Sequence, residues 1–265
     1  YSASQANTVV VLKQSIFVLF GLMLMFFLSQ PDPDFYKSNS LMFFGISIVL
    51  IVLTLLIGKE ANGAKRWLDF GFFTLQSSEI IKITLPVFLA AYLYDKKLPI
   101  SLLNTFITLI VILIIVNLVR IQPDLGTSLV ILMSGIYILF LAGLSWKFIG
   151  FSSIAFILSL PFFWNNFLEP FQQQRILTLL DPSADPYGTG WNITQSKIAI
   201  GSGGLFGKGF LNGSQSYLDY LPEKHTDFIF TLFSEEFGFF GSITILLIYS
   251  LIIHRIVQIG NVTRS

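Results

Sequence analysis

Seven long apolar runs constrain this chain more than any other feature of its sequence. They lie at about residues 14–28, 41–57, 78–94, 106–119, 129–143, 148–163 and 228–253. A helix needs roughly 20 residues to cross about 30 Å of hydrocarbon, so the shorter runs need flanking residues or a thin bilayer to span. Backbone groups in lipid must be satisfied within their own segment, which leaves helices as the spanning element. The runs predict an all-α polytopic membrane protein with about seven transmembrane helices.

Composition agrees with this prediction and excludes several classes of protein. Charged residues make up 12% and hydrophobic residues 54% of the 265 residues, whereas a soluble domain carries about 25% charged residues. The net charge of +1 argues against a nucleic-acid partner. The chain has no cysteine, which rules out disulfide bonds and thiolate metal sites. No small-residue cleavage site follows the first run, so we expect no signal peptide.

The one long polar segment, residues 181–230, leads directly into the last apolar run. Eight glycines fall between Asp181 and Gly213, so the backbone there can approach a ligand closely or adopt positive φ. The last polar residues before the apolar run are His225, Thr226 and Asp227. We therefore predict that this segment and the top of the following helix form an active site at a membrane surface.

Seven crossings place the polar segment on the same side of the membrane as the N-terminus, but the basic residues leave the orientation open. They divide between the two sides as Lys37, Lys96, Lys97 and Lys147 against Lys13, Lys59, Lys65, Arg66 and Arg120. The positive-inside rule does not separate two such sets. Basic residues on an outer face usually serve a purpose, such as binding an anionic ligand.

The run at 78–94 is the weakest candidate for a crossing, because it contains Glu79, Lys82 and Pro86. Glu79 and Lys82 are three residues apart and share a helix face. They form either a self-neutralising ion pair near the helix end or a charged site that faces the bundle, and we favour the site. Before them, Arg66 and Trp67 lie in an aromatic-rich segment. That segment is either a membrane-interface belt or part of the same site, and both interpretations stay open.

A short polar connection from Arg120 to Ser128 joins two of the apolar runs. Pro123 ends one helix, and Asp124 is suited to cap the next. Capping alone is the favoured explanation for Asp124. Arg120 and Gln122 lie on the same side as the long polar segment, so we keep them as candidate site residues.

The segment 201–209, GSGGLFGKG, looks like a nucleotide-binding loop but does not fit the pattern. A Walker A loop needs glycine where Ser202 stands, and Ser or Thr where Gly209 stands. What remains is a glycine-lined backbone with Lys197 and Lys208 nearby, which suits an anionic head group. A plain surface loop is the alternative.

The last apolar run begins with a row of small and polar residues. At 100° per residue one stripe holds Asp227, Thr231, Ser234, Gly238 and Gly241, with Ser242 beside it. Such a stripe favours close packing against neighbouring helices, with Asp227 at its mouth. For Asp227 a plain helix N-cap is the alternative.

Three other titratable residues of this region need an explanation. Glu235 and Glu236 are costly in hydrocarbon unless paired or protonated, so they are candidates for structural partners of buried bases. His225 does not make a zinc site, because the other histidine, His254, lies at the opposite end of the same run. We predict no metal site built from protein ligands alone.

Several motifs together resemble one known family. They are KRWLDFGFFTLQSSEIIK, QPDLGTS, LFLAGLSW, the segment 181–230 and EEFGFFG, in order from about residue 63 to residue 241. They are similar to the SEDS (shape, elongation, division, sporulation) family, and more to its elongation branch than to its division branch. The resemblance implies a partial SEDS-type transmembrane domain over residues 1–265, without the first and the last two of about ten family helices. It also implies an extracytoplasmic loop at about 169–226, with Lys96, Lys97 and Lys147 facing the cytoplasm.

An activity follows from the same resemblance. It implies a peptidoglycan glycosyltransferase of the bacterial cytoplasmic (inner) membrane, which polymerises lipid II into glycan strands for cell-wall elongation and rod shape. The implied partners are lipid II, a class B penicillin-binding protein and the elongation machinery. The family's essential Asp matches Asp227, and its further elements match Arg66, Trp67, Ser78, Glu79 and Lys82. Ser77 stands where the family usually has proline, a difference that affects the start of a helix more than the chemistry.

The expected mechanism uses Asp227 as the general base for the acceptor hydroxyl. Positively charged residues would stabilise the departing pyrophosphate, with a divalent cation, Mg²⁺ or Mn²⁺, as a further candidate. The candidate substrate-binding residues are Arg66, Trp67, Glu79, Lys82, Arg120, Gln122, Arg175, Lys197, Lys208 and His225.

Other functions stay open. A lipid II flippase would carry out no covalent chemistry, and a scaffold would only activate a partner synthase. Within the family, a division role is the alternative to elongation. A transporter should place polar residues through the depth of the membrane on several helices, but the runs between 106 and 163 are almost wholly apolar. This distribution favours an enzyme.

Overall fold

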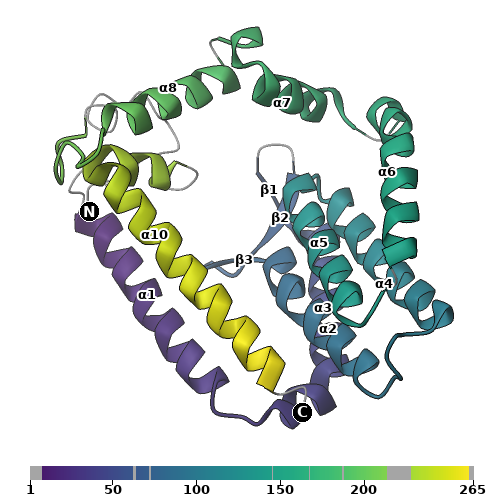
Figure 1. The fold of residues 1–265 in the computed structure, drawn as a ribbon. Helices are drawn as coiled ribbons and strands as arrows, with labels where there is room; N and C mark the ends of the chain where they lie inside the picture. The colour runs from purple at the N-terminus through teal and green to yellow at the C-terminus, as the bar shows by residue number, and fades with distance from the viewer. Residues whose placement is uncertain are drawn as a thin grey trace. The chain divides into compact units, whose positions relative to one another are not determined.

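The computed structural model describes residues 8–61, 64–71, 73–144, 146–166, 168–186, 188–213 and 228–262. The chain divides into two compact units. We call Met25–Leu160 the middle unit, and Tyr1–Leu24 together with Pro161–Ser265 the terminal unit. Each unit is described by itself, and Figure 1 labels the elements of both.

Four helices form the core of the middle unit. They are α2 (Pro33–Ile57), α3 (Ser77–Tyr94), α4 (Leu102–Ile121) and α5 (Leu125–Leu141). A further helix, α6 (Trp146–Asn166), starts in this unit and ends in the terminal unit. α2 packs against α3, α3 against α5, and α4 against α5. All four helices contribute fully buried apolar side chains, among them Ile51, Leu85, Ile112 and Ile131.

Hydroxyl groups join α2 to α3 inside this core. Ser47 Oγ lies 2.8 Å from Thr84 Oγ1, and Thr54 Oγ1 lies 2.9 Å from Ser77 Oγ. Hydroxyls on membrane helices tend to bond across helix interfaces, because lipid offers them no partner. Ser77 is fully buried. It therefore contributes a contact between helices that a proline at this position would lack.

A small antiparallel sheet connects α2 to α3. Its strands are β1 (Lys59–Ala61), β2 (Ala64–Asp69) and β3 (Thr74–Gln76), in the order β1-β2-β3. β2 packs on α2 and α3. Side chains alternate along a strand, so Leu68 is buried while Trp67 is exposed. The apolar runs do not predict this sheet. They indicate segments that lie in lipid, whereas the strands pair within a connection between two helices.

The terminal unit contains the start of the first helix, the polar segment and the last helix. Its elements are α1 (Thr8–Leu28), whose last residues belong to the middle unit, α7 (Pro170–Leu180), the 3-10 helix η1 (Pro182–Ala184), α8 (Thr189–Ser202) and α10 (Ile229–Val262). α8 packs against α10, and α7 and η1 pack against α8 (Figure 1). Residues 189–202 of the polar segment are thus helical, whereas the sequence predicts a glycine-rich loop.

The last helix, α10, is interrupted at Gly238, where φ is 67° and ψ is −161°. This region of backbone space is essentially restricted to glycine. The predicted stripe of small residues assumes a continuous helix, so it is wrong beyond Gly238. Eight residues of regular helix rise about 12 Å, yet Ser242 Oγ lies 2.9 Å from Ser234 Oγ. The interruption brings the two hydroxyls together.

The segment 203–209 fills the break in α10 with backbone hydrogen bonds. Four bonds of 2.9–3.2 Å run in two directions, and they pair Phe239 with Gly204, Phe240 with Leu205, Lys208 with Glu235, and Gly209 with Glu236. A Cβ on Gly207 would collide with the carbonyl group of Glu236, so glycine permits this approach. An interrupted helix leaves N–H and C=O groups that need other partners. The segment supplies them.

Six helices among the described residues are long and apolar enough to cross a membrane. They cover Val11–Leu28, Pro33–Ile57, Ser77–Tyr94, Leu102–Ile121, Phe148–Asn166 and Ile229–Gly260. The predicted run at 129–143 coincides with α5, which is apolar but has only 17 residues. Large apolar side chains such as Phe17, Leu113 and Ile248 are exposed on these helices, as surfaces that face lipid require. The chain is a multi-pass, predominantly α-helical membrane protein.

Candidate functional site

The predicted site residues fall into both units. The middle unit holds Arg66, Trp67, Glu79, Lys82, Arg120 and Gln122, and the terminal unit holds Arg175, Lys197 and Lys208. The remaining two, His225 and the predicted base Asp227, lie outside the described residues. We call the residues around β2, β3 and the α4–α5 turn the sheet cluster. The residues around segment 203–209 and the break in α10 form the break cluster.

Arg66 is the central side chain of the sheet cluster. Its Nε donates a hydrogen bond of 3.1 Å to the carbonyl oxygen of Gln122, and its Nη2 donates to the carbonyl oxygen of Pro123. The half-buried guanidinium group thereby ties β2 to the turn between α4 and α5. Within the described ranges Arg66 has no carboxylate partner. It therefore keeps its positive charge and further N–H donors for an anion.

A second tie runs between β3 and the same turn. Gln76 Nε2 donates to Asp124 Oδ2 at 3.0 Å and to Ser78 Oγ at 3.0 Å. The other carboxylate oxygen of Asp124 accepts from the N–H of Thr127 at 3.1 Å, which is the helix-capping role predicted for it. Gln76 was missed at the sequence level, because its partner is 48 residues away and no local pattern links the two.

Gln122 is a buried part of this turn, with only 1% of its surface exposed. Its Nε2 lies 3.4 Å from the carbonyl oxygen of Ile51 in α2. Its Oε1 has no hydrogen-bond partner among the described residues. This placement gives Gln122 a structural role between α2 and the turn. Contact of its side chain with a substrate stays a prediction that would need the buried amide to become accessible.

Glu79 and Lys82 form an ion pair in the first turns of α3, which was the alternative to the favoured prediction of a charged site. Lys82 Nζ lies 2.8 Å from Glu79 Oε1, with 28% of the lysine and 55% of the glutamate side chain exposed. The pair follows directly after β3, whose Gln76 is paired in register with Trp67 of β2. The pairing of Trp67 with Gln76 places Trp67 beside the end of β3, three residues before Glu79 in the chain. Half-exposed side chains of this kind are available for a ligand.

A second ion pair joins the first residue of β1 to the last residue of β2, between Lys59 and Asp69 at 3.0 Å. The pKa of Asp69 is lowered from its ordinary value, first by the hydrogen bond from the Gly71 N–H and then by Lys59. This ion pair is therefore neutral, and among the described residues it leaves Lys65 and Arg66 as the charges of β2 without an ion pair.

The break cluster centres on a buried ion pair. Lys208 Nζ lies 2.7 Å from Glu235 Oε1, and the glutamate side chain is fully buried. Ser202 Oγ lies 3.5 Å from the same oxygen. Glu235 thus pairs with a base, as predicted, but the lysine is partly exposed and not buried. The prediction that Lys208 receives the pyrophosphate is weakened, because its charge is already matched.

The glycines of segment 203–209 also have a different role from the predicted one. A Cβ on Gly203 would collide with the carbonyl oxygen of Ser234, and one on Gly238 would collide with the backbone of Gly207. These glycines allow segment and helix to pack closely. A Cβ on Gly201 or Gly204 would meet no atom within 4 Å, so the predicted binding of an anionic head group by this stretch stays a prediction.

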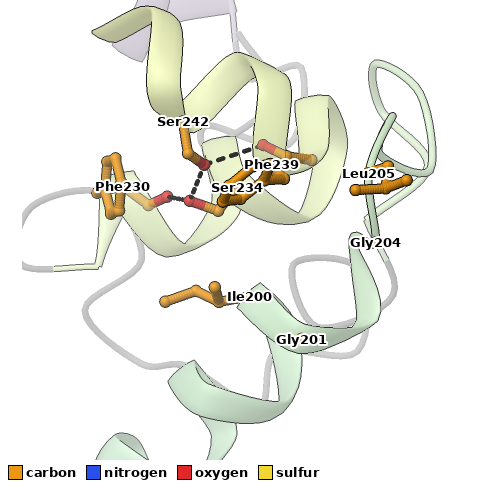
Figure 2. Close-up of a pocket in the computed structure, with 9 residues that line it drawn as sticks. Ile200, Gly201, Gly204, Leu205, Phe230, Ser234, Phe239 and Ser242 are labelled. Atoms are coloured by element: carbon orange, nitrogen blue, oxygen red, sulfur yellow. Dashed lines mark hydrogen bonds between the residues drawn. The ribbon is translucent and has the colours of Figure 1, made fainter. Parts of the chain in front are cut away.

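A pocket of about 420 Å³ lies beside the break. Figure 2 shows its wall, with Ile200 of α8 facing Phe230, Ser234 and Ser242 of α10. The only side-chain polar groups in this wall are the two serine hydroxyls, which bond to each other at 2.9 Å. The pocket is therefore mainly apolar. No local sequence signal marked it, because it depends on the interruption of α10.

The three remaining basic candidates lie on helices of the two units. Lys197 on α8 and Arg175 on α7 are exposed, and the Arg175 guanidinium lies 6.0 Å from the ring centroid of Phe171. Arg120 lies half-buried in the last turn of α4. Among the described residues, no group of three or more His, Cys, Asp or Glu could hold a metal ion.

Comparisons with known proteins point in one direction. A family model described as cell cycle protein, which covers FtsW, RodA and SpoVE, matches residues 1–265. The chain is 44% identical over 238 residues to the peptidoglycan glycosyltransferase MrdB of Escherichia coli (strain K12), covering 90% of this chain and 64% of that protein. It is 39% identical over 257 residues to the probable peptidoglycan glycosyltransferase FtsW of Buchnera aphidicola subsp. Acyrthosiphon pisum (strain APS), covering 96% and 64%.

Two solved structures are similar in fold. One is a chain from a peptidoglycan synthase complex, with a TM-score of 0.77, 30% identity and coverage of 94% of this chain and 69% of that chain. The other is the rod shape determining protein RodA of Thermus thermophilus, with a TM-score of 0.64, 26% identity and coverage of 96% and 66%. The chain spans about 64% of the length of the curated relatives it matches.

Proposed function

Because the chain belongs to the cell cycle protein family of FtsW, RodA and SpoVE, we propose that it acts in a peptidoglycan glycosyltransferase that polymerises lipid II into glycan strands. The observation that carries this proposal is the 44% identity over 238 residues to a peptidoglycan glycosyltransferase. Elongation and rod shape are favoured over division, since the relative named FtsW shares 39% identity. We further propose the bacterial cytoplasmic membrane as its location.

In this proposal Asp227 is the general base. It takes the proton from the acceptor hydroxyl while that oxygen forms a bond to the anomeric carbon of the donor, and the bond from that carbon to the lipid pyrophosphate breaks. Asp227 lies two residues before the start of α10 at Ile229. The part of α10 before the break is held by backbone bonds to Glu235 and Glu236 and by the Lys208–Glu235 pair. Such an anchor supports the positional precision that a general base requires.

The departing pyrophosphate needs positive charge that other residues do not already neutralise. Arg66 meets this condition best in the middle unit, because it is bonded to two carbonyl oxygens and to no carboxylate. In the terminal unit, exposed Arg175 and Lys197 are better candidates than Lys208, whose charge Glu235 matches. Trp67 and the half-exposed Glu79–Lys82 pair are proposed contacts for the sugar portion beside Arg66.

A divalent cation remains a proposal of its own. Mg²⁺ is typically held by one or two carboxylates together with substrate phosphates. The described residues contain no cluster that would hold an ion without substrate, so we assign no ligand to it and derive no step through it.

A gel assay for glycan polymer tests the proposal. Protein that contains this chain is purified in nanodiscs and mixed with lipid II, with and without a class B penicillin-binding protein, the proposed partner. We expect polymer, and we expect Asp227→Asn to lower its rate by about 10²–10⁴-fold while expression and membrane insertion stay normal. Transfer of lipid II between leaflets without polymer would favour a flippase. Polymer from the Asn variant at the normal rate would remove Asp227 from the mechanism.

A further inference from the structure

The middle unit contains a pocket of its own. It lies where α2 begins and α3 ends, at the opposite end of these helices from the sheet. Its volume is about 460 Å³, and its wall includes Asp34, Lys37 and Ser40 of α2 together with Phe88, Tyr92 and Asp95 at the end of α3. α2 ends and α3 begins at the sheet. The 18 residues of α3 span about 27 Å, so the pocket and the sheet cluster lie at opposite boundaries of the membrane.

The charges in the wall favour a positively charged guest. Lys37 Nζ lies 3.3 Å from Asp95 Oδ1 and 3.5 Å from the centroid of the Tyr94 ring, so its own charge is already matched. Asp34 is exposed and has no ion pair within the described ranges. Two carboxylates and one ammonium group leave the wall with a net charge of −1.

The aromatic part of the wall is fixed in place by its neighbours. Phe88 stacks on Phe44 at 4.4 Å between ring centroids, which fixes this side of the pocket. Tyr92 donates from its hydroxyl group to Asn104, so its ring is also held in place. Cations bind over aromatic faces when they lie within about 6 Å of the ring centroid. Lys96 Nζ already lies 5.2 Å from the Tyr92 ring and places a second positive charge beside the pocket.

We propose that this pocket binds the head group of a zwitterionic phospholipid that carries a primary amine. The amine fits between Asp34 and Asp95, and the phosphate group lies toward Lys96. A lipid is the favoured source of this chemistry, because both helices are membrane-spanning candidates that end at the pocket, where head groups are concentrated. The site is independent of the glycosyltransferase activity proposed above.

Native mass spectrometry of the full chain with added phosphatidylethanolamine or phosphatidylglycerol tests the site. We expect the chain to retain more phosphatidylethanolamine, by roughly two- to fivefold, the size of effect that exposed charge pairs produce. Asp34→Asn, alone and together with Asp95→Asn, should reduce this preference. Asp32→Asn is the matched control, because Asp32 precedes the same helix, makes no side-chain cap bond and is not part of the wall.

Three outcomes would overturn the proposal. The first is equal retention of the two lipids by the unmodified chain. The second is an equal loss of preference in the Asp32→Asn and Asp34→Asn variants, which would indicate a general charge effect at the helix end. The third is that a soluble lysine-rich peptide displaces both lipids equally well, which would identify a peptide site instead. A normal circular dichroism spectrum for each variant ensures that a lost preference does not reflect unfolding.

Discussion

In the sheet cluster, a side chain holds the irregular backbone of the turn between α4 and α5. In the break cluster, backbone groups of one segment hold the irregular backbone of α10. Arg66 reaches from β2 to the carbonyl oxygens of Gln122 and Pro123. At the break in α10, four backbone bonds and closely packed glycines perform the equivalent task, and the nearby charge of Lys208 is matched by Glu235. The first arrangement leaves a positive charge available, and the second leaves none. A positive charge near an irregular backbone therefore does not by itself identify an anion site.

The largest effect is expected from Gly238→Ala, which tests the backbone side of the comparison. The conformation at Gly238 costs a residue with a Cβ about 1–3 kcal/mol, and the collision with Gly207 adds about 1–3 kcal/mol of overpacking. We expect a clear fall in the thermal unfolding midpoint in detergent. Gly260→Ala on the same helix is the control, since a Cβ there meets no atom within 4 Å. Equal midpoints for the two variants would contradict the described break.

Glu235→Gln tests whether the buried pair is structural. Removing one partner of a buried ion pair costs about 3–5 kcal/mol, and we expect the lower end because Lys208 is partly exposed. Lys208→Met combined with Glu235→Gln should destabilise the chain by less than the sum of the single changes. Chemical unfolding of all four proteins measures this difference. Additive effects would show that the two side chains do not depend on each other.

Arg66→Lys tests whether the sheet cluster needs a guanidinium group or only a charge. Lysine keeps the charge but cannot donate to two carbonyl oxygens in the same geometry, so we expect a loss of about 1–2 kcal/mol in stability. Glycan synthesis should fall further than this loss explains. Comparing synthesis at a temperature where both proteins are folded separates the two effects. Full glycan synthesis in the Arg66→Lys variant would show that the reaction needs only a positive charge at this position.

The smallest effect concerns pH and Asp69. Its pKa is lowered in the folded chain by the Gly71 N–H and by Lys59, so its contribution to stability is present above the unfolded pKa of about 3.9. This contribution is lost as the pH falls through the lower folded value. Unfolding midpoints of the unmodified chain and Asp69→Asn should therefore differ at pH 6 and converge below about pH 4. A gap that stays constant with pH would assign the effect to packing.

The membrane-spanning architecture could be predicted from the sequence, because burial in lipid depends on local composition. Each apolar run coincides with a helix, although α2 begins at Pro33, eight residues before the run at 41–57. The identity of the partners could not be predicted, because they lie far along the chain. Gln76 and Asp124 are 48 residues apart, and Lys208 and Glu235 are 27 apart. No periodicity within one segment indicates such a pair.

The helical-wheel argument failed for a different physical reason. It places residues by a fixed angle of 100° per step, and a single glycine at positive φ invalidates every later position. The motif EEFGFFG contains that glycine, but the same letters also fit a small residue at a helix–helix contact. Only the carbonyl and N–H groups of segment 203–209 distinguish the two, and their arrangement is a property of the folded chain.

The interruption of α10 also separates two registers within what looks like one rod. Segment 203–209 bonds to Glu235 and Glu236 before Gly238 and to Phe239 and Phe240 after it, so it sets the rotation of both parts of the helix. Inserting one residue after the break would turn all later side chains by about 100° and leave Glu235 on Lys208. The same insertion before the break would pull the carboxylate away from its lysine. An insertion directly after the break would separate Ser242 from Ser234, so the length of the chain is constrained on both sides of this glycine, and only an insertion before it reaches the buried ion pair.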